Sequence, residues 1–294
     1  MTTLRTTNLL QDYNNMSALP RPCVLTVAGS DSGGGAGIQA DLKTFHAHGV
    51  HGTSAITAVT SQNTRAVTAV HGLPSRHIHS QLQALRDDFP IRAWKTGMLA
   101  DARTIRAVAA GMAGARADYV LDPVMISTSG ASLLQASAVS ALRSHLLPLA
   151  TLVTPNLPEA AALSGLPLGR RGDLDRIAAN LLAGGAAAVL IKGGHQRGAQ
   201  VIDRLYVDGE LHAFEHPRLA RNGHGTGCTL AAAITANLAL GLDLVAACRR
   251  AADYVHAALA GAYRPGRSTI DVLDHGAALA PLRAPRSRSG KRRP

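Results

Sequence analysis

The sequence predicts one α/β domain built around a mostly parallel β-sheet. Short apolar runs alternate with longer stretches of helical character along most of the 294 residues. Parallel strands joined by helical crossovers are the usual outcome of such alternation. The composition agrees, because 46% of the residues are hydrophobic but only 3% are aromatic. Small and aliphatic side chains suit helices that pack closely on a sheet.

The first half of the chain shows the alternation clearly. The apolar run CVLTVA predicts a buried strand that ends in a glycine turn, and SAITAVT is a second β-rich run followed by a polar turn. Two further apolar runs end at Gly97 and at Asp122-Pro123. The expected strands are therefore 23–28, 54–60, 93–96 and 119–121, with helices at 38–48, 80–87 and 102–112.

The second half continues the pattern and then changes it. Strands are expected at 151–153 and 188–191, and helices at 139–147 and 174–182. Residues 200–215 predict an antiparallel hairpin that turns at Asp208-Gly209, since Asp-Gly is a favoured two-residue hairpin loop. Two helices and no linker are expected after it.

Polar, Gly-rich or Pro-rich segments follow the expected strand ends. In open α/β sheets, ligands bind outside the carboxyl ends of the strands. The sequence places such segments at that edge six times, after Ala28, Thr60, Thr96, Leu121, Val153 and Ile191. A ligand site at this edge is therefore predicted.

The segment GHGTGC at 223–228 precedes an Ala-rich run of high helix propensity. Unpaired N–H groups at a helix start favour negative charge, and Gly225, Thr226 and Gly227 would let the backbone approach a phosphate closely. Cys228 would lie in the first turn, an environment that lowers a thiol pKa and makes it a plausible base. The alternative is a glycine connector with Cys228 as a small core residue.

A second glycine loop, GSDSGGGAG, begins at Gly29 and opens the first expected helix. A dinucleotide fingerprint would need an acidic residue about 20 residues further on. No Asp or Glu occurs between Asp41 and Asp87, which argues against nicotinamide and flavin cofactors. A Walker loop is absent as well. A glycine-lined pocket wall, or a structural turn, remains.

Asp41 and Gln62 are candidate ligand-binding residues. Asp41 lies one turn inside the first expected helix, and Gln62 lies just past the second strand. Together they could bind an amino-substituted heterocycle through donor and acceptor pairs. A solvated Asp41 is the simpler alternative. The histidines, including His46, His48, His51 and His224, lack metal-ligand spacing and are expected at the surface or in turns.

Three oxygen-bearing residues at strand ends are candidate Mg²⁺ ligands. Asp122 ends one strand, and Asn156 and Glu159 follow the next. Carboxylate, amide and water oxygens are the ligands that Mg²⁺ prefers beside phosphates. The alternatives are a turn cap and an ordinary helix start. Lys192 ends a buried strand, where a lysine is costly unless it meets an anion, so a phosphate contact is expected.

The charge and cysteine content exclude several classes. The net charge is +11, but six of these charges come from residues 283–294, which hold five Arg and one Lys and no acid. Nucleic-acid binding would therefore rest on this tail alone. Three cysteines without ligand spacing argue against disulfides and zinc, and favour the cytoplasm. No membrane-spanning segment is expected, and the polar residues 1–21 are expected to be a disordered leader.

Seven motifs in one order resemble a known family. They are AGSDSGGGAGIQADLKT, TAVTSQNT, KTGML, LDPVM, TPNLPEAA, LIKGGH and GHGTGCTLAAAI, between residues 28 and 234. Together they resemble the hydroxymethylpyrimidine/phosphomethylpyrimidine kinases of thiamine biosynthesis, within the ribokinase-like superfamily. The resemblance implies a three-layer α/β/α sandwich over 22–282, with 283–294 left as a basic disordered tail.

The resemblance also implies a reaction and residue roles. ATP would phosphorylate 4-amino-5-hydroxymethyl-2-methylpyrimidine and then its monophosphate. Gln62, Asp41 and Gly29 would bind the pyrimidine, and Asp122, Asn156 and Glu159 would organise Mg²⁺. Lys192 would contact the transferring phosphate, and residues 225–227 would form the anion hole. Cys228 would take the place of the catalytic aspartate of other ribokinase relatives. A homodimer is expected.

One segment departs from the family pattern, and two other functions stay open. The family's C-terminal Gly-rich segment ending in Gly-Pro corresponds here to YRPGRSTID at 263–271. This leaves open how the nucleotide is covered and how efficient the second phosphorylation is. The positive charge of Arg264 or Arg267 could take the place of the family's segment beside the nucleotide. The alternatives to the predicted activity are a pyridoxal or pyridoxine kinase and a non-catalytic pyrimidine-binding protein.

Overall fold

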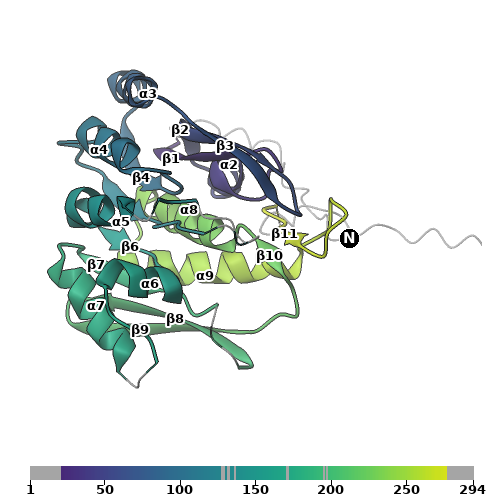
Figure 1. The fold of residues 1–294 in the computed structure, drawn as a ribbon. Coiled ribbons are helices and arrows are strands. Elements are labelled where there is room, and N and C mark those ends of the chain that lie inside the picture. The colour runs from purple at the N-terminus through teal and green to yellow at the C-terminus, as the bar shows by residue number, and fades with distance from the viewer. Residues whose placement is uncertain are drawn as a thin grey trace, which may run out of the picture.

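The computed structural model describes residues 21–276 except 127–129, 131–132, 136, 170–171, 195 and 197 (Figure 1). The expected leader at 1–21, apart from Arg21, and the basic tail at 283–294 lie outside the described residues. The domain boundaries predicted from the sequence therefore stay predictions.

Nine strands of the described chain form one twisted sheet in the order β3-β2-β1-β4-β5-β6-β7-β8-β9. The strands β2, β1, β4, β5, β6 and β7 pair in parallel, and β3, β8 and β9 add antiparallel edges. The predicted, mostly parallel sheet is confirmed. The bounds are β1 Cys23–Asp31, β2 His51–Gln62, β3 Val67–Gly72, β4 Ile91–Thr96, β5 Asp118–Leu121, β6 Leu152–Val153, β7 Ala188–Ile191, β8 Gln200–Val207 and β9 Glu210–Pro217.

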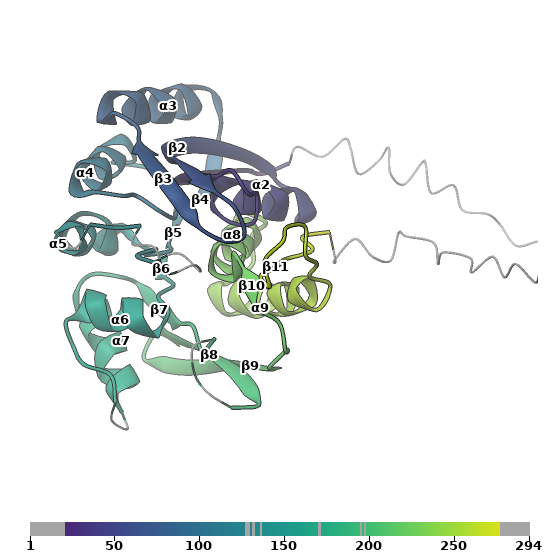
Figure 2. The same cartoon turned by 45° about the vertical axis from the view of Figure 1, so that its right-hand side comes forward.

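Helices cover both faces of this sheet, which confirms the three-layer sandwich. Figure 2 shows α3, α4, α5, α6 and α7 on one side and α2, α8 and α9 on the other. Each side has its own apolar core, one with Leu82 and Ile105 and one with Phe45 and Ile234. The bounds are α2 Gly37–Ala47, α3 Ser75–Asp88, α4 Ala102–Gly111, α5 Ala138–Ala141, α6 Leu157–Ser164, α7 Asp173–Ala183, α8 Thr226–Ala239 and α9 Leu244–Ala260.

One local prediction is confirmed, and two elements differ from what the sequence predicted. The hairpin is confirmed: β8 and β9 turn at Asp208 and Gly209, both with positive φ, as the type I′ turn requires. The helix expected at 139–147 is instead a short α5 followed by the π-helix Leu142–Leu146 and the 3₁₀ turn Leu147–Leu149. Strand β3 was not expected, because its residues are mostly exposed and show no apolar alternation.

A small second sheet positions the start of α8. Strand β10 (Gly223–His224) pairs in parallel with β11 (Asp271–Val272). This pairing fixes the segment that leads into α8 from a point almost fifty residues further along the chain. As a result, the α8 N-terminus lies beside the carboxyl ends of the central strands (Figure 1).

Candidate active site

A cavity of about 730 Å³ lies at the carboxyl ends of β1, β4, β5, β6 and β7. Its size is that of a small-ligand site. Ten of the eleven residues predicted for the site line it: Gly29, Gln62, Asp122, Asn156, Glu159, Lys192, Gly225, Thr226, Gly227 and Cys228. Six of these ten residues lie at strand ends and four at the start of α8, and Asp41 is the residue that does not line the cavity.

The N-terminus of α8 forms one wall of the cavity. Gly225 precedes the helix with φ +84°, and a Cβ there would lie 1.9 Å from the Gly35 carbonyl oxygen. A Cβ at Gly227 would lie 3.1 Å from Lys192 Nζ. Glycine is therefore needed at position 225, where the two glycine loops meet, whereas the glycine at 227 leaves room for the Lys192 ammonium group. The first-turn N–H groups lack intrahelical partners and favour an anion.

Cys228 lies in this first turn, but its thiol is not activated in the way the sequence predicted. Burial raises the pKa of Cys228 to about 12, although the Lys95 ammonium and a hydrogen bond from the Gly37 backbone both favour the thiolate. The expectation of a lowered pKa is wrong for this structure, because desolvation outweighs the helix start and the nearby cation.

Lys192 lies between two carboxylates at the cavity wall. Its Nζ is 2.9 Å from Asp122 Oδ1 and 3.8 Å from Glu159 Oε2. Burial disfavours the ammonium, but these carboxylates outweigh it and raise the pKa of Lys192. Burial, partly offset by Lys192, raises the pKa of Glu159. This cluster brings one fixed cation and two acidic groups to the same point of the cavity.

Asn156 has the structural role that was the alternative to metal binding. Its side-chain oxygen accepts a hydrogen bond from the Glu159 backbone at 2.9 Å, and the Glu159 carboxylate accepts one from the Asn156 backbone at 2.8 Å. This reciprocal pair is a capping box that starts α6. The cap holds Glu159 toward the cavity, so Asn156 positions an acidic group.

Asp41 does not reach the cavity. It is fully buried behind the wall, where its carboxylate lies 3.0 Å from Lys95 Nζ and accepts a hydrogen bond from Thr26 Oγ1 at 2.6 Å. The neighbouring carboxylate outweighs burial and raises the pKa of Lys95. The expectation that Asp41 contacts the pyrimidine directly therefore fails in this conformation. The alternative of a solvated Asp41 is wrong as well, because Asp41 is fully buried. Its partner Lys95 lies 54 residues away in the sequence and could not be predicted from it.

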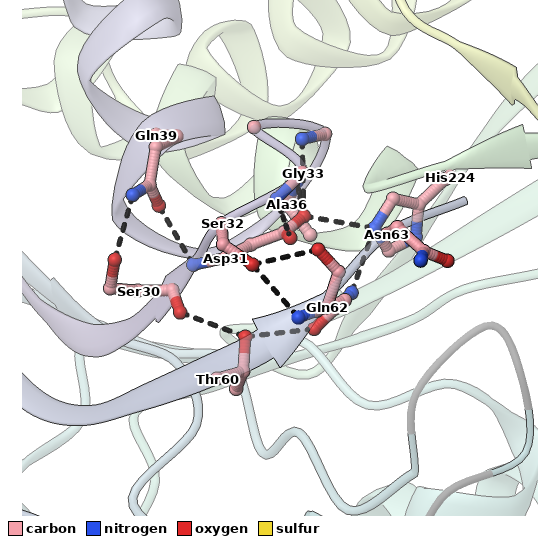
Figure 3. Close-up of polar contacts among 12 residues, drawn as sticks. Ser30, Asp31, Ser32, Gly33, Ala36, Gln39, Thr60, Gln62, Asn63 and His224 are labelled. Atoms are coloured by element: carbon pink, nitrogen blue, oxygen red, sulfur yellow. Dashed lines mark hydrogen bonds and ion pairs between the residues drawn. The ribbon is translucent and has the colours of Figure 1, made fainter. Parts of the chain in front are cut away.

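Figure 3 shows a polar network around Gln62 that the sequence did not predict. His224 is only 8% exposed, and its Nε2 lies 3.1 Å from Asp31 Oδ2 and 3.2 Å from the Gln62 amide. The expectation of a surface or turn histidine is wrong for His224, because the β10–β11 pairing carries it into the cavity wall. The adjacency of His224 to the GTGC segment was the available signal.

Two contacts help to hold the segment at 263–271, which departs from the family pattern. Arg264 Nε donates to the buried Asp271 at 3.0 Å, and Gly266 packs against Thr64. Neither Arg264 nor Arg267 lines the cavity. The idea that either arginine replaces the family's nucleotide-covering segment gains no support from this geometry.

Comparison with known proteins agrees with this geometry. The family model described as phosphomethylpyrimidine kinase matches residues 31–272. The chain belongs to the phosphomethylpyrimidine kinase family. A hydroxymethylpyrimidine/phosphomethylpyrimidine kinase from Streptomyces coelicolor is 48% identical over 259 residues, covering 88% of this chain and 96% of that protein. The predicted family and the kinase class are thereby confirmed.

Other relatives and solved structures match different shares of the chain. A bifunctional thiamine biosynthesis protein from Geobacter sulfurreducens is 46% identical over 266 residues, and the chain spans 54% of its length. The phosphomethylpyrimidine kinase structure from Clostridium difficile superimposes with TM-score 0.72 at 40% identity, covering 80% of this chain and 98% of that one. An ADP complex of Bacillus subtilis pyridoxal kinase superimposes with TM-score 0.80 at 35% identity, covering 87% of this chain and 98% of that one.

The carboxylates of Asp122 and Glu159 suit a kinase, which binds nucleotide phosphates. The buried Asp122 Oδ2 has no hydrogen-bond partner among the described residues, although Oδ1 is bound by Lys192. An unpartnered buried carboxylate oxygen at a cavity wall suits a cation or its water. No group of three or more His, Cys, Asp or Glu side chains in the described part of the chain forms a ready-made metal cage. Mg²⁺ held by one or two carboxylates, water and phosphate needs no such cage.

None of the described helices combines the length and apolar character needed to cross a bilayer.

Proposed function

We propose that this kinase transfers the terminal phosphoryl group of ATP to the hydroxymethyl oxygen of 4-amino-5-hydroxymethyl-2-methylpyrimidine, and then phosphorylates the monophosphate. The observation that carries the proposal is the meeting of Lys192, two carboxylates and the glycine-led α8 N-terminus in one cavity. Family membership and the 48% identity to a named kinase of this substrate support it.

Different residues of the cavity would have different roles in phosphoryl transfer. Such a transfer depends on positioning and charge neutralisation more than on covalent chemistry. The N–H groups of the α8 first turn and the Lys192 ammonium would neutralise the charge on the transferring group. Gly225 and Gly227 let the backbone and Lys192 approach without side chains in the way.

Asp122 and Glu159 would hold Mg²⁺, directly or through water. The unpartnered Asp122 Oδ2 supports this assignment. When bound, the ion would neutralise phosphate charge. ATP as the co-substrate is supported by kinase neighbours solved with ADP and with AMP-PCP, the latter from Staphylococcus aureus.

Cys228 would accept the proton that leaves the hydroxymethyl group. The oxygen forms its bond to phosphorus, the bond from phosphorus to the ADP oxygen breaks, and the proton passes to the Cys228 thiolate. Its high pKa makes the thiolate a minor species at neutral pH. The nearby Lys95 ammonium and the Gly37 N–H stabilise that minor form. Gln62 and Gly29, which line the same cavity, would bind the pyrimidine ring.

A kinase that acts on pyridoxal is the second candidate, because several solved neighbours are pyridoxal kinases. Both substrates carry a hydroxymethyl group on a heteroaromatic ring. The higher identity to relatives named for the pyrimidine substrate favours the first candidate.

The deciding experiment compares the two substrates with the purified full-length protein and Mg-ATP. We expect kcat/KM for the aminopyrimidine to exceed that for pyridoxal by at least about tenfold, which corresponds to about 1.4 kcal/mol of transition-state binding. A preference for pyridoxal would overturn the substrate assignment. ATP hydrolysis that does not depend on either ring would overturn the kinase assignment.

We also infer a homodimer that works in the cytoplasm. The family resemblance supports the first statement, and the absence of disulfide-like cysteine spacing supports the second. Light scattering on the purified protein should give twice the chain mass of 30.5 kDa; the mass of one chain would contradict the dimer.

A further inference from the structure

We propose that Asp31 and His224 are positioning residues that lock the Gln62 side-chain amide in one orientation, and that this orientation selects an aminopyrimidine over its oxo analogue. The inference rests on the proposed function, because it takes Gln62 as the residue that binds the ring. It assigns a task to the network in Figure 3, which lies at the cavity wall.

The first step is that Asp31 is an ionised acceptor. Its carboxylate accepts hydrogen bonds from the backbone N–H groups of Gly33 at 2.8 Å, Gly35 at 3.1 Å and Ala36 at 2.9 Å. Burial raises the pKa of Asp31, but the hydrogen bonds from His224, Gly33 and Ala36 outweigh burial and lower it overall. An ionised carboxylate can only accept hydrogen bonds.

The second step is that His224 Nε2 carries a proton. It lies 3.1 Å from Asp31 Oδ2, so it must be the donor of this contact. The same Nε2–H faces the end of the Gln62 amide at 3.2 Å. A donor nitrogen cannot accept a hydrogen bond from an amide NH₂ group. The amide end that faces His224 must therefore be the oxygen.

Thr60 leads independently to the same orientation. Its hydroxyl has one proton but two acceptors within reach, the Ser30 carbonyl at 2.9 Å and the Gln62 amide atom drawn as Oε1 at 3.2 Å. Both contacts are hydrogen bonds only if the proton goes to the Ser30 carbonyl and this amide end is the NH₂ group, which donates to the hydroxyl oxygen. The two ends of an amide have the same shape and are distinguished by their hydrogen bonds. These hydrogen bonds place the amide oxygen of Gln62 at His224 and its NH₂ group at Thr60, the reverse of the assignment drawn in Figure 3.

The locked amide makes the site selective. An aminopyrimidine presents an acceptor ring nitrogen beside a donor amino group, and an amide pairs with both in one orientation only. The 4-oxo analogue presents the reverse order, a ring N–H beside a carbonyl oxygen. A fixed amide leaves mismatched polar groups with that analogue, whereas a free amide turns over and pairs with it. Because the ring carbon that bears the hydroxymethyl group is next to the amino-bearing carbon, the accepted edge also fixes the position of the reacting oxygen.

The experiment measures kcat/KM for 4-amino-5-hydroxymethyl-2-methylpyrimidine and for its 4-oxo analogue, and compares their ratio between variants. We expect the wild type to prefer the amino compound by at least about 100-fold. His224→Leu releases the amide, so the ratio should fall by about tenfold or more. His224→Gln can donate to both Asp31 and the amide oxygen, so the ratio should stay within about threefold.

His275→Gln is the matched control. His275 is buried to a similar degree and contacts the Thr229 hydroxyl at 3.1 Å, but it does not line the cavity. Its ratio should equal that of the wild type. If His224→Leu lowers both kcat/KM values equally, His224 is only structural and the proposal is overturned. A wild type without preference overturns it as well.

A second measurement needs no turnover. In NMR spectra of the wild type, the Gln62 NH₂ protons should show NOEs to Thr60 protons, and NOEs to the His224 ring instead would overturn the inference. This distinguishes its failure from that of the proposed function, which fails when the wild type phosphorylates neither pyrimidine. If His224→Leu does not fold, Thr60→Val removes the other contact and should also lower the ratio.

Discussion

Two lysines with different surroundings bring positive charge to the active-site edge. Lys192 lines the cavity and meets Asp122, whereas Lys95 is fully buried and pairs with Asp41 behind the wall. The first was predicted from its place at the end of a buried strand. The second was not, because its partner Asp41 lies 54 residues away in the sequence. Only the packing of α2 on the sheet brings this pair together.

The buried pair predicts a large loss of stability on Lys95→Met. The substitution leaves Asp41 buried without its cation, which costs about 3–5 kcal/mol of unfolding free energy. Urea unfolding would measure this loss. Arg176→Met is the matched control, because the Arg176 side chain is 65% exposed and lies 3.6 Å from Asp173 Oδ1, three residues earlier on the same helix; it should cost about 0–1 kcal/mol. A similar small loss for both variants would contradict a stabilising role for the buried pair.

The raised pKa of Cys228 predicts a rate that increases with pH. A thiol with a pKa of about 12 loses its proton mainly above neutral pH, so a thiolate-dependent kcat should rise between pH 6 and 9. Cys228→Ala should lower kcat by about 10²–10⁴-fold and remove this slope, with little change in KM. Steady-state kinetics across this pH range measure both. Full turnover with an unchanged pH profile in Cys228→Ala would exclude the proton-accepting role.

At the scale of elements, the site depends on the contact between two glycine loops. The loop before α2 and the loop before α8 meet at Gly35 and Gly225, and this contact puts the start of α8 beside the strand ends. The loop before α2 was predicted as a pocket wall or a structural turn, and the loop before α8 as a phosphate-binding helix start or a glycine connector. Their mutual contact was not, because glycine spacing records backbone freedom but not the partner that uses it.

This contact predicts that Gly225→Ala costs more than backbone strain alone. Positive φ disfavours alanine by roughly 1–2 kcal/mol, and here the new Cβ would also lie 1.9 Å from the Gly35 oxygen. Gly241→Ala is the control, since Gly241 has φ +89° but no heavy atom within 4 Å of the added Cβ. Thermal unfolding should show the larger loss for Gly225→Ala, together with loss of kinase activity. Equal losses would contradict the importance of the loop contact.

For the whole molecule, the parallel strands and their polar ends were predictable from local patterns, whereas the contacts among the site residues were not. Alternation of apolar runs specified six parallel strands, and their ends carry six of the ten expected residues that line the cavity; the other four, residues 225–228, come from the start of α8. Strand β3 was missed because its residues are mostly exposed, and β10 and β11 were missed because neither of these two-residue strands is a continuous apolar run. The same β10–β11 pair brings His224 to Gln62 across 162 residues, a distance that local pattern does not encode.

A crystal structure with a non-hydrolysable ATP analogue, Mn²⁺ in place of Mg²⁺ and the aminopyrimidine would test the account most directly. We predict the terminal phosphate at the N–H groups of residues 226–228, within hydrogen-bond distance of Lys192 Nζ. We also predict Mn²⁺ anomalous signal beside Asp122 and the hydroxymethyl oxygen facing Cys228. A terminal phosphate bound away from the α8 N-terminus would contradict the account.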